Sequence, residues 1–124
     1  MIMRNRKNIH WYLVFESMEE ARNRVPLNKT VRVEIPGKTL CLAHSPDGFY
    51  ATDDRCPHQG LPVSRGGVCE DGHLVCPFHR YAWSLHTGKE SRGIEANMRF
   101  YEVIEDKEGL FIGIPQKRKW WQLF

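Results

Sequence analysis

The chain has 124 residues, of which 41% are hydrophobic and 27% charged, which fits one globular domain and excludes extensive disorder. No apolar run approaches the ~18 residues of a membrane span, and the polar segment 1–8 is not a secretory signal, so we expect a cytoplasmic protein. The net charge of +3 comes from three cations in 4–7 and three in 117–119, which leaves the body at −3. A nucleic-acid-binding domain would instead carry a basic face on its body.

The N-terminal half predicts a short helix and several antiparallel strands. Residues 9–15 are rich in aromatic and β-branched side chains, which favour a strand. Ser17 followed three residues later by Glu20 is a capping box, which predicts one or two helical turns ending near residue 25. Apolar alternation and Pro-Gly or Asp-Gly turns then predict three strands in quick succession. These strands cover 31–35, 40–43 and 49–52.

The C-terminal half predicts short strands, two loops and a final hairpin. Asp71-Gly72 separates two short apolar runs, which is typical of a hairpin turn. The expected strands are 67–69, 73–75, 81–85, 100–104 and 110–114. The fold class is therefore all-β, an antiparallel β-sandwich or barrel. We expect one domain over 1–124, with a base of about 9–52 and 84–115, an inserted subdomain of about 53–83 and a tail of 116–124.

Two short motifs, each with one cysteine and one histidine, lie in the inserted region. The first motif is Cys56-Pro57-His58 and the second is Cys76-Pro77-Phe78-His79, with 17 residues between them. Thiolates and imidazoles suit iron–sulfur, zinc or copper centres. A zinc site usually takes two cysteines from one motif and two histidines from the other. Mixed motifs instead let a two-iron cluster lie across both loops, and a structural zinc site is the alternative.

The pattern C-x-H-(17 residues)-C-x-x-H resembles Rieske proteins, and the small soluble Rieske ferredoxins most closely. Gly60, Gly66-Gly67 and the stretch Trp83-Ser84-Leu85…Thr87-Gly88 extend the resemblance, which covers about residues 9–115. It implies a base domain with an inserted cluster-binding subdomain and one [2Fe–2S] cluster per chain. The ligands that it implies are Cys56 and Cys76 on one iron and His58 and His79 on the other, with no catalytic residue.

The residues around the motifs predict a low-potential centre. Rieske potentials span roughly −150 to +300 mV, against about −400 mV for plant-type ferredoxins. In the high-potential respiratory Rieske proteins, the positions of Leu61 and Phe78 are cysteines joined in a disulfide, and those of Tyr81 and Trp83 are hydroxyl donors to the cluster. This chain lacks the disulfide, and Trp83 has no hydroxyl. Since hydrogen bonds to cluster sulfur raise the potential, we expect the low end of the range.

Arg80 stands where the family has a glycine after the second histidine. Glycine permits unusual backbone conformations, so Arg80 is expected either to change the loop or to present a positive charge beside the cluster. Together with Arg55 and Arg65 it would make a basic docking tip, and the alternative is three solvated arginines.

The remaining histidines and cysteines are interpreted as structural or surface residues. Cys41 and Cys69 are expected to be free thiols, with a disulfide between them as the alternative. The histidines without a predicted role are His10, His44, His73 and His86.

The resemblance implies a one-electron carrier that passes electrons from a flavin reductase to a terminal oxygenase. We expect an electron-transfer component rather than an enzyme in its own right, acting as a monomer with no nucleic-acid partner and no membrane span. A terminal oxygenase would need a further mononuclear iron site, for which the roughly 45 residues after the cluster leave no room. The alternatives are the small subunit of an NAD(P)H nitrite reductase, which looks similar, and a module in which a metal only holds the loops.

The C-terminal segment 117–124 combines three basic residues with three aromatic ones. We interpret it as a tail that covers an apolar patch of the base. Docking to a membrane surface or a protein is the alternative.

Overall fold

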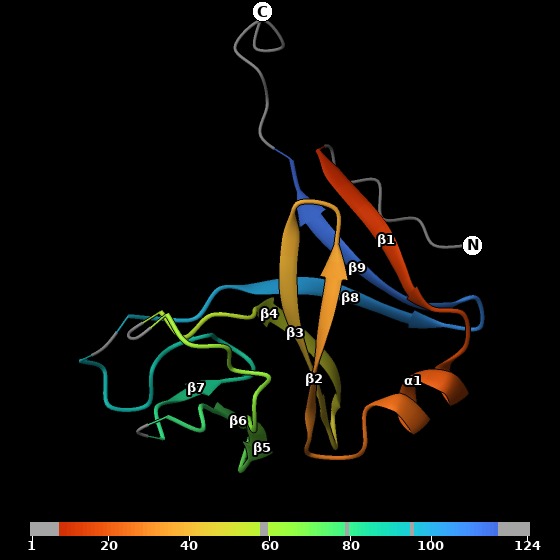
Figure 1. Ribbon diagram of the computed structural model, residues 1–124. Coiled ribbons are helices and arrows are strands. Elements are labelled where there is room, and N and C mark those ends of the chain that lie inside the picture. Colours follow the sequence, from red (N-terminus) through yellow and green to blue (C-terminus); the bar gives the residue numbers. More distant parts are fainter. Residues whose placement is uncertain (1–7, 58–59, 79, 95, 117–124) are drawn as a thin grey trace, which may run out of the picture.

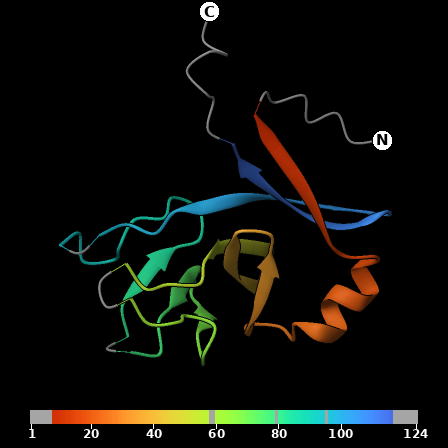
Figure 2. The same ribbon diagram turned by 45° about the horizontal axis from the view of Figure 1, so that its top comes forward.

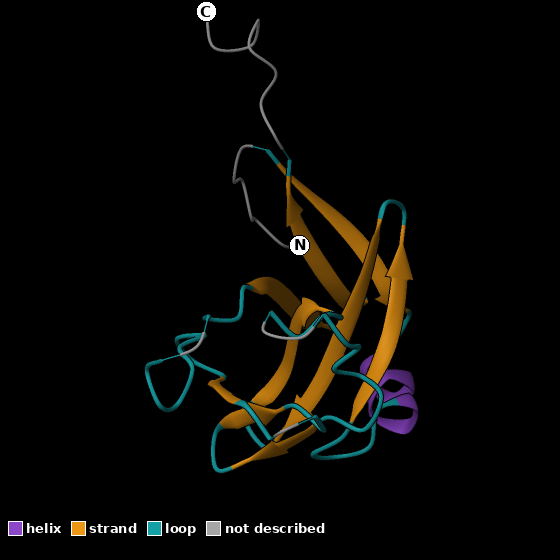
Figure 3. Cartoon of the chain, turned by 60° about the vertical axis from the view of Figure 1, so that its left-hand side comes forward, coloured by secondary structure: helices purple, strands orange, loops and turns teal. Residues whose placement is uncertain are grey.

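The computed structural model describes residues 8–57, 60–78, 80–94 and 96–116 (Figure 1). Within these ranges almost all regular structure is strand, and the single helix is short (Figure 3). In chain order the elements are β1 (Ile9–Phe15), α1 (Met18–Arg24), β2 (Thr30–Ile35), β3 (Lys38–Ser45), β4 (Gly48–Asp53), β5 (Val68–Glu70), β6 (His73–Val75), β7 (Ala82–Ser84), β8 (Phe100–Asp106) and β9 (Gly109–Pro115).

A six-stranded antiparallel sheet forms the base, in the order β1-β9-β8-β4-β3-β2. Its two halves are joined by only two residue pairs between β4 and β8, Ala51 with Tyr101 and Thr52 with Phe100. Because this junction is short, the halves curl toward each other around one apolar core (Figure 1). The buried side chains of this core are Phe15, Ala21, Val25, Leu40, Leu42, Phe49, Ala51, Tyr101, Leu110, Ile112 and Ile114.

The helix α1 covers one end of the base sheet, away from the motifs. The Ser17 hydroxyl accepts the backbone N–H of Glu20 at 3.0 Å, as the capping box predicts. The helix ends at Val25, one residue before a proline. Its buried Ala21 and the capping Val25 belong to the base core, so this end of the molecule is fastened independently of the motifs.

A smaller sheet, β5-β6-β7, carries the loops with the motifs. It is tied to the base around the start of β2: the Cys69 N–H donates to the Asn28 carbonyl at 3.0 Å, and the hydroxyl of Thr30, the first residue of β2, donates to the Gly67 carbonyl at 2.9 Å. The loops around it gather at the end of the molecule opposite α1 (Figure 2). The motifs are therefore held at one tip of the fold.

The predicted all-β fold is confirmed, and every predicted strand is present with its ends shifted by at most two residues. The base is one curled sheet in which β1 and β9, the first and last strands along the chain, pair antiparallel. The division at about residues 53 and 83, and the tail at 116–124, stay predictions. Within the described ranges, no helix has the length and apolar character that crossing a membrane requires.

Candidate metal centre

The structure brings the two predicted cysteine ligands together in a second apolar core. Cys56 and Cys76 are both fully buried, and their thiols lie close enough to interact with each other. Val63, Leu74, Trp83 and other apolar side chains surround them. The other two predicted ligands, His58 and His79, lie outside the described residues. The assignment of all four as ligands therefore stays a prediction.

The loop of the first motif is shaped by backbone bonds and one carboxylate. The Gly60 N–H donates to the Cys56 carbonyl at 2.7 Å, and the Cys56 N–H donates to the Leu61 carbonyl at 2.8 Å. Gly60 has a φ of +73°, in the left-handed region that favours glycine. Asp54 accepts both the N–H and the hydroxyl of Ser64, which closes the far side of the loop. These bonds fix the direction of the Cys56 side chain.

The loop of the second motif begins where strand β6 ends. The Cys76 N–H donates to the Tyr81 carbonyl at 2.7 Å, so the loop closes on itself across the motif. The Phe78 N–H points at Cys76 Sγ, 3.5 Å away. The two loops touch where Gly66 meets Pro77: a Cβ at Gly66 would lie 3.4 Å from Pro77 Cβ. A larger side chain at that position would push the loops apart.

The donor chemistry of the cysteine pair fits a cationic metal centre. Burial raises the pKa of Cys76 to about 11; the Phe78 N–H partly offsets this rise, and the adjacent Cys56 adds to it. Two buried neighbouring thiols become thiolates together only beside a cation, which repays the loss of solvation. An N–H aimed at the sulfur favours the thiolate further. The pair therefore suits a metal that thiolates coordinate, such as iron or zinc.

Comparison with known proteins decides which centre this is. Residues 10–101 match the Rieske [2Fe-2S] domain family. The chain belongs to this family. Membership implies a [2Fe–2S] cluster, as the sequence motifs predict, and the buried thiol pair fits one.

Relatives of this Rieske chain include short and long proteins. The 3-phenylpropionate/cinnamic acid dioxygenase ferredoxin subunit of Escherichia coli strain K12 is 32% identical over 94 residues, which cover 74% of this chain and 87% of that protein. Cholesterol 7-desaturase of Caenorhabditis elegans is 38% identical over 81 residues, covering 64% of this chain but only 18% of the desaturase. The chain thus spans about a fifth of the length of this longer relative.

A solved structure supports the Rieske fold. A chain in the complex of reduced oxygenase and oxidized ferredoxin in carbazole 1,9a-dioxygenase superposes with a TM-score of 0.69. The match covers 88% of this chain and 97% of that chain at 24% sequence identity. At this identity, the likeness establishes the fold.

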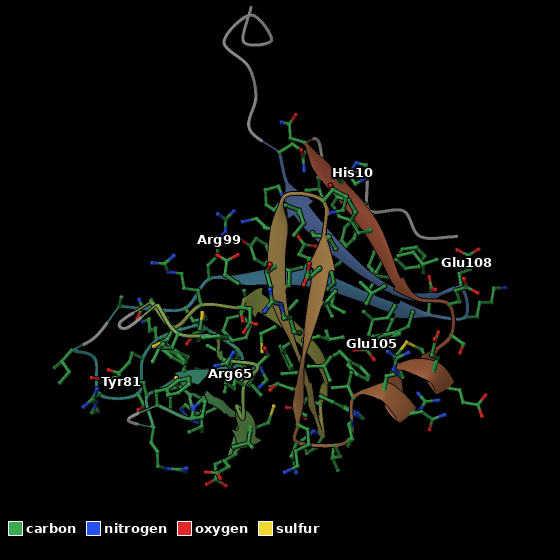
Figure 4. The ribbon with its side chains drawn as sticks, viewed as in Figure 1. His10, Arg65, Tyr81, Arg99, Glu105 and Glu108 are labelled. Atoms are coloured by element: carbon green, nitrogen blue, oxygen red, sulfur yellow. The ribbon has the colours of Figure 1, made fainter. Side chains whose placement is uncertain are left out.

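Trp83 and Tyr81 replace the two hydroxyl donors of high-potential Rieske proteins, and both make other contacts here. Trp83 is fully buried, and its Nε1–H donates to the Ala96 carbonyl at 3.0 Å. Tyr81 is half-buried, and the Arg92 guanidinium lies 4.7 Å from its ring centroid (Figure 4). The one polar hydrogen of Trp83 is thus directed at backbone rather than at a cluster sulfur, which supports the predicted low potential.

Arg80 takes the backbone conformation that glycine adopts freely. Its φ is +53°, so the loop keeps a left-handed residue at this position despite the side chain. The guanidinium donates to Glu70 Oε1 at 2.9 Å, and both side chains are more than half exposed. Arg55 lies beside Gly60, and Arg65 is exposed. The predicted basic tip is therefore reduced to two arginines, since Glu70 neutralises the third.

The four remaining histidines lie in the structural or surface positions predicted for them. His44 Nδ1 lies 2.8 Å from the Val25 carbonyl, and its ring stacks on Phe49. His73 Nδ1 lies 2.9 Å from a backbone carbonyl of its own turn. His86, like His10, is exposed.

Cys41 and Cys69 are free buried thiols, as predicted. Burial raises the pKa of Cys69 to about 11 and that of Cys41 beyond the usual thiol range.

The sequence reasoning missed Glu90, the one carboxylate that is buried near the site among the residues that the structure describes. Its side chain is 0% exposed and forms an ion pair with Arg92 at 3.1 Å. In the sequence, both residues lie in the polar loop 89–97, where charged residues are usually solvated. No local signal distinguishes this pair from an exposed one.

Proposed function

We propose that this Rieske protein is a one-electron carrier that takes electrons from a flavin reductase and passes them to an oxygenase-type acceptor. The observation that carries this proposal is the match to the ferredoxin subunit of a dioxygenase over 87% of that subunit's length. That relative is named as the ferredoxin subunit of a dioxygenase. The predicted ligands are Cys56, His58, Cys76 and His79.

The described residues have clear tasks in such a carrier. A bound [2Fe–2S] cluster supplies a site that takes up and gives up one electron. The chain excludes water from the thiol side through its buried core around Cys56 and Cys76. It places both loops at one tip, where a partner can approach closely (Figure 2). Two apolar side chains remain exposed on the loops around the site, Leu61 at 38% and Ile94 at 70%.

A second role is favoured by the longer relatives. Identity to cholesterol 7-desaturase and to the 4beta-methylsterol monooxygenase of Methylococcus capsulatus is 38%, higher than the identity to the ferredoxin subunit. The same Rieske fold would then deliver its electron to an oxygenase iron within one larger assembly. The chemistry of the described site is the same in both roles, and only the acceptor differs.

The cytoplasm is the compartment that we propose for this carrier. None of the four cysteines forms a disulfide, although Cys41 and Cys69 both lie in the second core. Thiols that remain unpaired are typical of a reducing compartment.

Anaerobic reductive titration of the purified holoprotein tests the proposal. A carrier takes up about one electron per two irons, seen as partial bleaching of the visible absorbance, and returns it to an added oxidant with full recovery of the spectrum. A colourless protein that contains zinc and takes up no electron would overturn the proposal. It would leave a module in which metal only holds the loops.

A further inference from the structure

Residues 89–94 and 96–98, here called the strap, run past the loop of the second motif at the tip of the molecule (Figure 1). The strap is bonded to strand β7 along its length. The Ser84 N–H donates to the Lys89 carbonyl at 2.9 Å, and the Ser91 N–H donates to the Ala82 carbonyl at 2.8 Å. Trp83 Nε1–H donates to the strap at Ala96. Strand β7 begins three residues after the second motif, so the strap lies beside the loop of that motif.

The buried carboxylate of Glu90 accepts several hydrogen bonds from the strap. Its Oε1 accepts the backbone N–H of Arg92 at 3.2 Å and of Ile94 at 3.3 Å, while Oε2 accepts Arg92 Nε at 3.1 Å. The backbone of Glu90 also forms a β-bridge with Trp83. It is the one charged residue among the buried residues that the structure describes.

A fully buried carboxylate is costly unless it is paired and hydrogen-bonded, and pairing one rarely stabilises a fold beyond what an apolar side chain would achieve. The burial of Glu90 therefore calls for an explanation other than stability, and the contacts of Arg92 provide it. The Arg92 guanidinium is held by Glu90 on one side and lies over the Tyr81 ring on the other. Tyr81 lies two residues after the second motif, and its carbonyl accepts the Cys76 N–H. One chain of contacts thus joins the buried carboxylate to a predicted cluster ligand.

We propose that Glu90 is a positioning residue for the cluster: through Arg92 and Tyr81 it holds the strap closed against the loop of the second motif and keeps water from the metal. This inference rests on cluster binding at the site proposed above and not on the identity of the redox partner. In Glu90→Gln the neutral amide keeps one oxygen for the two strap N–H groups, but its NH2 group faces the Arg92 guanidinium, so the ion pair is lost and the strap opens locally.

The expected change in reduction potential has a definite sign. Two ferric ions, two sulfides and two thiolates sum to zero charge, and uptake of one electron gives −1. Water admitted by an open strap solvates the charged, reduced state better, and loss of the Glu90 charge favours the same state. Glu90→Gln therefore raises the midpoint potential.

The chain offers a matched control. Arg32 and Glu34 form the same Nε–Oε2 pair, also two residues apart and 3.3 Å long, but both side chains are more than half exposed on β2. Glu34→Gln thus removes an equivalent charge and hydrogen bond away from the cluster. Any effect of Glu90→Gln that the control shares is not due to the strap.

The experiment measures release of iron from the reduced holoprotein to a ferrous chelator, together with the midpoint potential. Glu90→Gln is expected to release iron about tenfold faster than the parent. Because the opening is local, this rate should not change when urea is added at low concentrations. Glu34→Gln stays within about twofold of the parent. Arg92→Gln also accelerates release, whereas Arg92→Lys, which keeps the charge, largely restores the parent rate.

Two results would overturn the inference. The first is parent-like release and potential in Glu90→Gln and Arg92→Gln. The second is acceleration that rises with urea as global unfolding does, because that indicates a general loss of stability. If Glu90→Gln fails to assemble a cluster, the two Arg92 variants still decide. Failure of the carrier proposal is distinguishable, because it would appear in the parent protein as absence of a reversible one-electron couple.

Discussion

Arg80 provides a direct test of how the loop of the second motif is built. Its backbone is left-handed, with a φ of +53°, and its guanidinium pairs with Glu70 at 2.9 Å. Arg80→Gly and Arg80→Ala both remove the guanidinium and therefore lose the same ion pair. The two variants differ only in how well they tolerate the left-handed conformation.

The magnitudes follow from these two terms. The side chains of the pair are 66% and 51% exposed, so its loss costs roughly 0.2–1 kcal/mol after solvent screening, and it costs both variants the same. Alanine at a positive φ is less favourable than glycine by about 1 kcal/mol. For a domain of this size, that difference corresponds to about 4 °C in melting temperature. Arg80→Gly, which also relieves the strain of a side chain at this φ, should melt at or slightly above the parent, and Arg80→Ala about 1–4 °C below it.

The assay is thermal melting of the holoproteins, followed by circular dichroism at one scan rate because loss of the cluster makes unfolding irreversible. Glu70→Gln is the control, since it removes the ion pair without changing the backbone at Arg80. If Arg80→Ala and Arg80→Gly melt within about 1 °C of each other, or if the alanine variant melts higher, the left-handed strain that we assign to this loop is refuted.

Three further predictions concern the rest of the tip. Trp83→Phe removes the indole N–H and leaves the strap carbonyl without its donor, a loss of about 2 kcal/mol. The holoprotein should therefore melt about 8 °C below the parent at the same scan rate, and an unchanged melting temperature would contradict this. Because the pKa of Cys69 is about 11, only about 0.1% of this cysteine is thiolate near pH 8. Cys69 and Cys41 should therefore resist alkylation in the folded protein and react faster as the pH rises toward 11. Both should be labelled fully once the protein is denatured. Ile94→Ser should slow electron transfer to the oxygenase acceptor about threefold or more, because it weakens docking. Leu27 is an exposed leucine beside the helix, and Leu27→Ser should leave the rate unchanged. Equal effects of the two substitutions would exclude a docking role for Ile94.

The strands and the motif spacing were predictable because their signals are local. Alternating side chains and two-residue turns determine each hairpin within about ten residues, and β1 has the predicted bounds of 9–15. The ligands could be predicted from the motifs without knowledge of the tertiary structure, since metal chemistry restricts the residue types that can bind. The positions of His58 and His79 lie outside the described residues, so their role stays a prediction.

The contacts that shape the tip were not predictable, because they join residues whose pairing depends on the fold. Arg80 meets Glu70 only because the fold places the loop after β6 beside β5. Glu90 is buried because the strap lies against β7, and the polar sequence around it favours exposure. The curl of the base sheet follows from the short β4–β8 junction, which no sequence pattern marks.

Voltammetry of the holoprotein on an electrode tests most directly whether this chain is a low-potential Rieske electron carrier. We predict a reversible one-electron wave near the low end of the Rieske range, roughly −150 mV. The potential should fall at alkaline pH, because the oxidised cluster favours deprotonation of its imidazole ligands. A wave near +300 mV would contradict the predicted low potential, a wave near −400 mV would contradict mixed ligation, and no wave at all would contradict the carrier itself.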